Sequence, residues 1–163
     1  MLNLTQTRER GAKAMGERAL IITEKEDVGV YLHWNGTPME VRAILAYCAC
    51  MGYRPPERDN YGWAQFIKTA ANYIDGNRRS KGTGIGIISR AQEDGVFSSP
   101  GDNGIYVIRD WRVVRREGAW EEDGPCGGED LLRLMQDIND CQPCPIEADE
   151  LEEFVHQWEY GTE

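Results

Sequence analysis

Short apolar runs near the start of the chain follow the two-residue period of β-strands. Residues 19–23 form one β-rich run, and residues 28–34 form a second run in which every second residue is apolar. The polar residues 24–27 separate the two runs. The pattern therefore predicts an antiparallel hairpin at the start of the folded domain.

Signals for the start of a helix follow this hairpin. Thr37 and Glu40 have the spacing of a T-x-x-E capping box, and Pro38 occupies the first helical position. Apolar residues then recur at helical spacing up to Gly52, where the helix is expected to end. A second amphipathic helix is expected to begin near residues 59–60.

The second half of the chain repeats both patterns. Residues 84–89 read as a strand, and residues 104–109 and 111–115 read as a second hairpin that turns near residues 109–110. Apolar residues then recur at helical spacing within residues 131–138 and 151–158. These stripes predict two further helices, which close the chain.

Together these elements predict one α+β domain in the order ββαα-βββ-αα, with an antiparallel sheet of about five strands covered by helices on one side. Residues 1–16 are expected to form a loose N-terminal extension, residues 17–116 the α+β core, and residues 117–163 an acidic helical region packed on or appended to it. The residues expected in the core include Leu32, Trp34, Ile44, Phe66 and Ile87.

Charge is distributed unevenly along the chain. The 163 residues are 40% hydrophobic and 28% charged, which is typical of a globular domain and excludes collagen, membrane bundles and wholesale disorder. The chain has 28 Asp and Glu residues and 18 Lys and Arg residues, which gives a net charge of −10. Direct binding of nucleic acid is therefore not expected. Residues 117–163 hold fifteen acids and one base, a net −14, which leaves +4 for residues 1–116.

The ends of the chain and its cysteines predict a cytoplasmic protein. Charged residues interrupt residues 1–20, unlike the apolar core of a secretory signal, and no apolar run approaches the roughly 20 residues that cross a bilayer. The five cysteines are odd in number and unevenly spaced, so reduced thiols are expected. We therefore expect neither a membrane partner nor a cofactor.

A glycine-rich basic loop is the first candidate ligand site. Its cations and hydroxyl groups can hold phosphate or carboxylate oxygens, although the order of a P-loop is absent and the loop can equally be a solvated connection. A histidine and an indole at the earlier strand-to-helix junction, residues 33–36, can flank a ligand or serve the fold. The candidate residues are Arg78, Arg79, Ser80, Lys81, His33, Trp34 and Asn35.

The cysteines offer a second, weaker candidate site. Cys141 and Cys144 have C-x-x-C spacing, and together with Cys126 and His156 they provide a chemically possible zinc ligand set. The motif lacks the second cysteine pair typical of structural zinc sites. It also follows a predicted helix, whereas a redox C-x-x-C motif lies at the start of one. Ordinary thiols, zinc ligands and a redox pair are thus all consistent with the sequence.

Acidic residues of the last predicted helix form a candidate partner-binding surface. They lie off its apolar stripe, so they are expected to face solvent, where they either recognise a basic partner or only keep the protein soluble. A basic loop and an acidic tail in one chain also make self-association into a homo-oligomer plausible. The candidate residues are Glu147, Asp149, Glu150, Glu152, Glu153 and Glu159.

Three segments carry a resemblance to known proteins. R-A-L-I at residues 18–21, Y-L-H-W-N-G at residues 31–36 and G-D-N-G-I-Y-V at residues 101–107 resemble a group of small phage- and mobile-element-encoded proteins without an assigned activity. The resemblance spans about residues 17–115 and implies an accessory role, such as blocking host defence. It implies no catalytic residue.

Three classes of function are consistent with these observations. The first is a protein that binds and inhibits a host protein, one that handles nucleic acid, through the acidic surface. The second is a small-molecule binder that sequesters a phosphorylated nucleotide through the basic loop, with Trp34 stacking on its base. The third is a hydrolase or transferase built around His33, for which the sequence offers no partner base or nucleophile.

Overall fold

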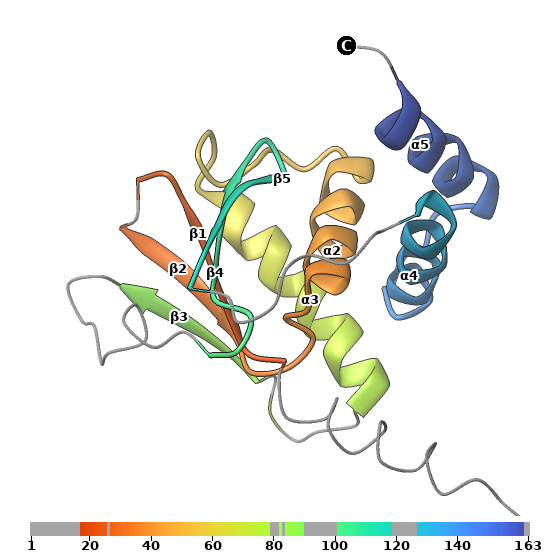
Figure 1. Ribbon diagram of the computed structural model, residues 1–163. Helices are drawn as coiled ribbons and strands as arrows, with labels where there is room; N and C mark the ends of the chain where they lie inside the picture. The colour runs from red at the N-terminus through yellow and green to blue at the C-terminus, as the bar shows by residue number, and fades with distance from the viewer. Residues whose placement is uncertain are drawn as a thin grey trace, which may run out of the picture.

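The computed structural model describes residues 17–25, 27–78, 82, 84–89, 101–118 and 127–161, without the side chains of residues 77 and 78. The expected N-terminal extension lies outside these residues. The described elements form a single α+β domain in the expected order. They are β1 (Ala19–Thr23), β2 (Val28–Leu32), α2 (Pro38–Cys50), α3 (Tyr61–Arg78), β3 (Ile85–Ser89), β4 (Ile105–Arg109), β5 (Arg112–Glu117), α4 (Gly128–Asp140) and α5 (Ala148–Tyr160) (Figure 1).

The five strands form one sheet in the order β3-β2-β1-β4-β5. Three neighbouring pairs are antiparallel as expected, but the central pair, β1 and β4, is parallel. The sheet is therefore mixed rather than antiparallel. The connection from β1 to β4 includes α2 and α3, which is long enough to return the chain to the same end of the sheet before β4 begins.

The start of α2 confirms the capping signal. Thr37 is the N-cap, and its hydroxyl accepts a 3.5 Å hydrogen bond from the backbone N–H of Glu40. The same hydroxyl donates to the Glu40 carboxylate at 2.7 Å, so the two side chains bond each other at the first turn of α2. The helix ends before Gly52, whose φ of 70° suits glycine.

The main core lies between one face of the sheet and the helices. Leu32, Ile44 and Phe66 are buried there as expected, and Trp34 packs against the core while remaining partly exposed. The expectation for Ile87 is wrong, because this side chain is 69% exposed. Its strand, β3, is at the edge of the sheet, and among the described strands only β2 lies beside it.

The opposite face of the sheet has a smaller cluster. Leu20, Ile22 and Val107 are almost completely buried, and Tyr31 packs against them. Figure 1 shows the described helices on the other side of the sheet, with α4 and α5 beyond α2. None of the described helices is long and apolar enough to cross a membrane.

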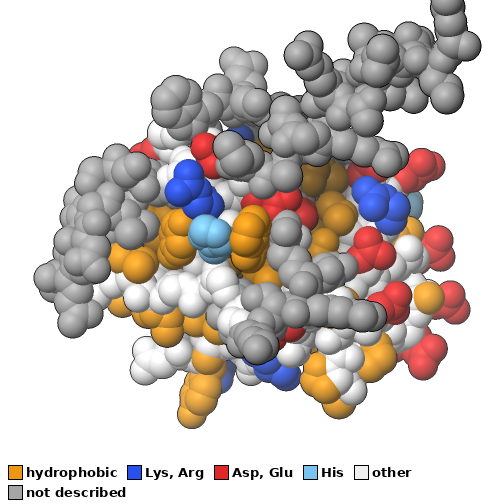
Figure 2. Space-filling model, turned by 90° about the horizontal axis from the view of Figure 1, so that it is seen from below, with side chains coloured by type: hydrophobic (Ala, Val, Ile, Leu, Met, Phe, Trp, Pro, Cys, Tyr) orange, Lys and Arg blue, Asp and Glu red, His pale blue; other side chains and the backbone are white. Residues whose placement is uncertain are grey.

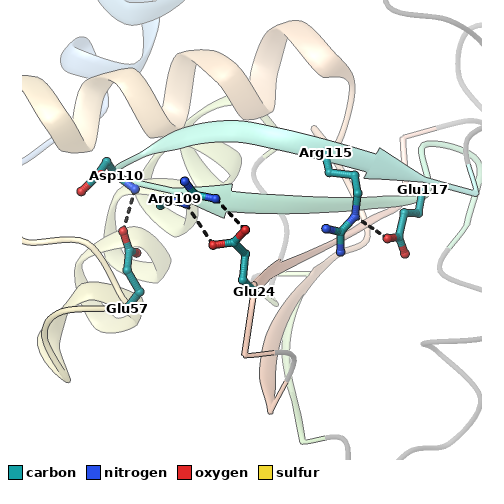
Figure 3. A network of polar contacts seen from close by, with 6 residues as sticks. All are labelled: Glu24, Glu57, Arg109, Asp110, Arg115 and Glu117. Atoms are coloured by element: carbon teal, nitrogen blue, oxygen red, sulfur yellow. Dashed lines mark hydrogen bonds and ion pairs between the residues drawn. The ribbon is translucent and has the colours of Figure 1, made fainter.

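A two-residue turn joins β4 to β5 one residue later than expected. Asp110 and Trp111 both have positive φ, 49° and 61°, as in the turns that suit the twist of a hairpin. The Asp110 N–H donates to Glu57 at 2.6 Å, and Arg109 donates two hydrogen bonds to Glu24 (Figure 3). The buried Trp111 donates from its indole to the carbonyl of Tyr53 at 2.6 Å, which holds an uncommon conformation for a bulky residue.

The C-terminal helices share the core of the domain. Leu131 and Met135 of α4 and Leu151 and Val155 of α5 are buried in the same cluster as α2 and the sheet. Their burial means that α4 and α5 are packed on the core and are fixed relative to it.

Asn139 is a buried polar centre between α2 and the segment that leads to α5. Its side-chain oxygen accepts from the Tyr47 hydroxyl at 2.7 Å and from the Ile146 N–H at 2.9 Å. Its amide donates to the Ile146 carbonyl at 2.9 Å. These three bonds fix the chain just before α5 begins.

Candidate functional site

An acidic surface covers the solvent side of α4 and α5. Figure 2 shows acidic side chains gathered along the side of the molecule where these two helices lie. Every carboxylate in this set belongs to a residue that is exposed to solvent. The acidic surface consists of Glu129, Asp130, Asp137, Asp140, Glu147, Asp149, Glu150, Glu152 and Glu153.

The helical period produces this surface on α5. Leu151 and Val155 point into the core, and Phe154 and Trp158 border them with rings stacked 5.2 Å apart. Carboxylates at the remaining positions are therefore turned toward solvent. Five residues predicted from the sequence, Glu147 among them, are exposed as expected.

Glu159 is the exception among the six predicted partner-binding residues. It forms an ion pair with Arg42 of α2, and its side chain is only 12% exposed. Arg42 is 117 positions away in the chain, so the sequence gives no local sign of this contact. Glu159 therefore fastens α5 to the core and is separate from the acidic surface.

A second contact fastens the same end of α5. The guanidinium of Arg112 on β5 lies 3.6 Å from the ring centre of Trp158 and donates to the Trp158 carbonyl at 3.1 Å. Cation–π contacts of this kind contribute about 0.5–1 kcal/mol at exposed sites. With Glu159 paired to Arg42, α5 is held at a fixed orientation and its carboxylates form a rigid array.

The charges of the acidic surface are largely uncompensated within the described part of the chain. Only Asp137 has a cation nearby, Arg133 at 3.9 Å, and no described Lys, Arg or His nitrogen lies within 4.0 Å of the other eight carboxylates. Five arginines of the core instead pair with acids of the core. These pairs are Arg18–Asp102, Arg54–Asp59, Arg58–Asp110, Arg109–Glu24 and Arg115–Glu117.

Part of the acidic surface also favours the helices themselves. Glu129 and Asp130 lie in the first turn of α4, and Asp149 and Glu150 lie in the first turn of α5. Negative charges there interact favourably with the positive end of the helix dipole, by about 0.3–1 kcal/mol each. Helix stability accounts for these four positions, but it does not account for Asp140, Glu152 or Glu153 toward the middle and end of the helices.

The W-N-G junction between β2 and α2 is a structural element. Asn35 is buried, has a φ of 58° and donates to Glu40 at 2.8 Å. A side chain at Gly36 would overlap the carbonyl oxygen of Glu17, and the Gly36 carbonyl accepts from the Tyr106 hydroxyl at 2.9 Å. Asn35 is therefore buried and orients the start of α2.

His33 and Trp34 are more exposed to solvent than Asn35. The His33 side chain is exposed, and its ring meets the indole of Trp34 edge-on at a centroid distance of 4.4 Å. Gly84 lies beside both residues. Its carbonyl accepts a hydrogen bond from the His33 N–H at 2.8 Å, and a β-carbon at this position would lie 2.8 Å from the Trp34 indole. Of the basic-loop candidates, Arg79, Ser80 and Lys81 lie outside the described residues, as does the side chain of Arg78.

The cysteines do not gather into a metal site in the described part of the chain. No group of three or more His, Cys, Asp or Glu side chains there is arranged to hold a metal ion, and Cys126 lies outside it. Burial raises the pKa of Cys48 to about 12, and burial with the nearby Asp140 raises the pKa of Cys141. Raised pKa values disfavour the thiolate that metal binding and disulfide exchange require.

Sequence reasoning missed part of the acidic surface and the residues that hold it in place. The α4 carboxylates Glu129, Asp130, Asp137 and Asp140 carry the same helical signal as those of α5 and extend the surface across two helices. Comparison with protein-family models, curated proteins and solved structures finds no match to the chain. The resemblance to phage proteins therefore stays a prediction.

Proposed function

We propose that this protein is an accessory protein of a phage or mobile element that binds and inhibits a host protein through the acidic surface. In this proposal the partner acts on nucleic acid in the bacterial cytoplasm, and the carboxylates of α4 and α5 occupy its cationic binding surface. Binding requires no chemistry from this chain. The acidic surface is its functional part.

The observation that carries the proposal is the separation of paired from unpaired charge. Residues 127–161 hold ten acids and one base, a net −9. Five described arginines of the core pair with acids of the core, whereas eight of the nine carboxylates of the acidic surface have no described cation within 4.0 Å. Solubility alone would be served by acids spread over the whole surface, so their concentration on two fixed helices favours recognition.

The chemistry of the surface favours a partner that normally holds a nucleic acid. Such proteins carry Lys and Arg side chains in place to neutralise phosphates, and a rigid row of carboxylates offers the same charge. Electrostatic complementarity of this kind raises the association rate and excludes partners of like charge. A partner with an acidic or neutral surface would gain nothing from these residues.

The test is capture from a bacterial extract treated with nuclease, followed by identification of the retained proteins by mass spectrometry. The chain is compared with a variant that carries Glu150→Lys, Glu152→Lys and Glu153→Lys, three exposed positions off the apolar stripe. The control carries Asp27→Lys and Asp75→Lys, which reverse exposed acids on the core.

The proposal predicts a nucleic-acid-handling protein that is retained by the wild type and the control, is lost with the reversed variant and is released by added duplex DNA. Retention should also weaken steeply as salt is raised, because exposed charges are screened over about 8 Å at physiological ionic strength. The proposal fails if the reversed variant retains the same proteins as the wild type, or if DNA releases none of them.

A further inference from the structure

We propose that the exposed ring of Tyr160, at the end of α5, is the binding site for an arginine side chain of the partner. This inference rests on the proposed function and narrows it, because it identifies the cationic group that is recognised as a guanidinium rather than an ammonium. The guanidinium stacks on the Tyr160 ring, and its N–H groups donate to carboxylates of the acidic surface beside the ring.

Tyr160 is a large side chain on the solvent face of α5. It is 68% exposed. It follows Glu153 by seven positions and His156 by four, so these three side chains share one face of the helix. The opposite face packs on the core through Leu151 and Val155. The Tyr160 ring therefore lies within the acidic surface and takes no part in the packing of the core.

Two contacts fix the position of the Tyr160 ring. The His156 ring lies one turn earlier on the helix, with the ring centres 5.6 Å apart. A β-carbon built on Gly128, at the start of α4, would lie 3.2 Å from the Tyr160 hydroxyl oxygen, so this hydroxyl lies close against the backbone there. A ring that is held at both ends loses little conformational freedom when a ligand stacks on it.

Carboxylates lie on both sides of this ring. Glu153 precedes Tyr160 on the same face of α5, and Glu129 and Asp130 follow Gly128 directly in the first turn of α4. All three are exposed, and none has a described Lys, Arg or His nitrogen within 4.0 Å. These carboxylates are therefore available to accept hydrogen bonds from a guanidinium.

The core side of the same helix binds arginines with the same kinds of group. The guanidinium of Arg112 lies 3.6 Å from the ring centre of Trp158, and Arg42 pairs with Glu159. Thus α5 already holds two arginines by one aromatic ring and one carboxylate. Tyr160 and its neighbouring carboxylates present these groups to solvent, and no described cation lies over the Tyr160 ring.

These groups suit arginine better than lysine. The planar guanidinium stacks on an aromatic ring while its N–H groups point outward in its own plane, where carboxylates can accept from them. The ammonium of lysine is compact and strongly hydrated, so it gains less from contact with a ring. The charge of the acidic surface attracts both side chains, whereas Tyr160 selects arginine.

The test is isothermal titration of the full chain, at low ionic strength, with two peptides of equal charge, hexa-arginine and hexa-lysine. We expect the wild type to bind hexa-arginine more tightly. Tyr160→Leu removes the ring and should weaken hexa-arginine binding by about 2- to 5-fold, the effect of one exposed cation–π contact, with a smaller change for hexa-lysine. Tyr160→Phe keeps the ring and should keep the preference of the wild type for arginine.

Two further variants separate the ring from charge and from the fold. Tyr61→Leu removes a tyrosine that is 72% exposed at the start of α3, and it should bind both peptides as the wild type does. The variant with Glu150, Glu152 and Glu153 changed to Lys should bind both peptides much more weakly, because it reverses the charge that attracts them. Circular dichroism should show Tyr160→Leu folded, since its ring is exposed.

Three results would overturn the inference. One is an equal change in the binding of the two peptides on Tyr160→Leu. Another is loss of the arginine preference in Tyr160→Phe, which would assign that preference to the hydroxyl group. The third is a dimer in size-exclusion chromatography that Tyr160→Leu dissociates, because a second copy of this chain would then supply the arginine.

The same titrations distinguish failure of this inference from failure of the proposed function. Equal binding of both peptides by the wild type, lost in the variant with three Lys, would refute the role of Tyr160 and leave the acidic surface as the binding surface. Failure of the wild type to bind either peptide would contradict both proposals. An arginine preference that depends on Tyr160, without capture of a nucleic-acid-handling protein from the extract, would refute the proposed function alone.

Discussion

Replacing Asn139 with alanine should destabilise the whole domain, because this one side chain connects α2, α4 and the start of α5. The change removes three hydrogen bonds of 2.7–2.9 Å, one from Tyr47 and two with Ile146. Each is worth about 1 kcal/mol net, and the buried Tyr47 hydroxyl left without its acceptor adds about 1–3 kcal/mol. We expect a loss of about 4–6 kcal/mol in the free energy of unfolding.

Urea unfolding followed by circular dichroism measures this loss, with ΔG extrapolated to water. Tyr47→Phe should cost only about 1 kcal/mol, since Asn139 still accepts from Ile146. In the Asn139→Ala background the same Tyr47 change should instead recover about 1–3 kcal/mol, because it removes the buried hydroxyl that has lost its acceptor. Gln136→Ala, at an exposed position of the same helix, is the control and should stay within about 0.5 kcal/mol of the wild type.

Two results would refute this reasoning. A loss below about 1 kcal/mol for Asn139→Ala would mean that the buried bonds do not hold α4 and α5 on the core. Equal costs of Tyr47→Phe in both backgrounds would mean that the Tyr47–Asn139 bond contributes no coupling.

Three further predictions concern the rest of the fold. Trp111→Ala removes a buried indole and its hydrogen bond, so a thermal melt should report a loss of about 3–5 kcal/mol. Hydrogen bonds from Arg109 hold the pKa of Glu24 below its usual 4.5, so this contact stabilises the fold above that pH. The difference in urea midpoint between the wild type and Glu24→Gln should therefore shrink as the pH falls through the lowered pKa. Cys48 is buried with a pKa of about 12, whereas Cys144 is exposed. Mass spectrometry after alkylation at pH 8 should therefore find Cys144 modified and Cys48 intact, and early modification of Cys48 would contradict its burial.

Local signals in the sequence predicted the elements of the fold well. The capping residues Thr37 and Pro38 mark the observed start of α2, and the apolar stripes mark the buried faces of α4 and α5. These signals work because a cap or a helical face depends on residues within a few positions of each other. The same reasoning predicted that Glu150, Glu152 and Glu153 are exposed.

Contacts between distant segments could not be predicted in this way. The parallel pairing of β1 with β4 depends on where α2 and α3 return the chain, and all five residues of β1 are buried, so no alternation reveals its neighbours. Ile87 looks like a core residue until the strand order places it at an edge. Glu159 resembles the other acids of α5, and only the tertiary fold brings Arg42 to it.

The central claim is that the acidic surface occupies a cationic nucleic-acid-binding surface of the partner. The most direct measurement is displacement of fluorescently labelled duplex DNA from the partner captured in the extract, followed by anisotropy as this protein is added. The account predicts displacement by the wild type and by the variant with Asp27 and Asp75 changed to Lys, and none by the variant with Glu150, Glu152 and Glu153 changed to Lys. Equal displacement by the wild type and that triple variant would contradict it.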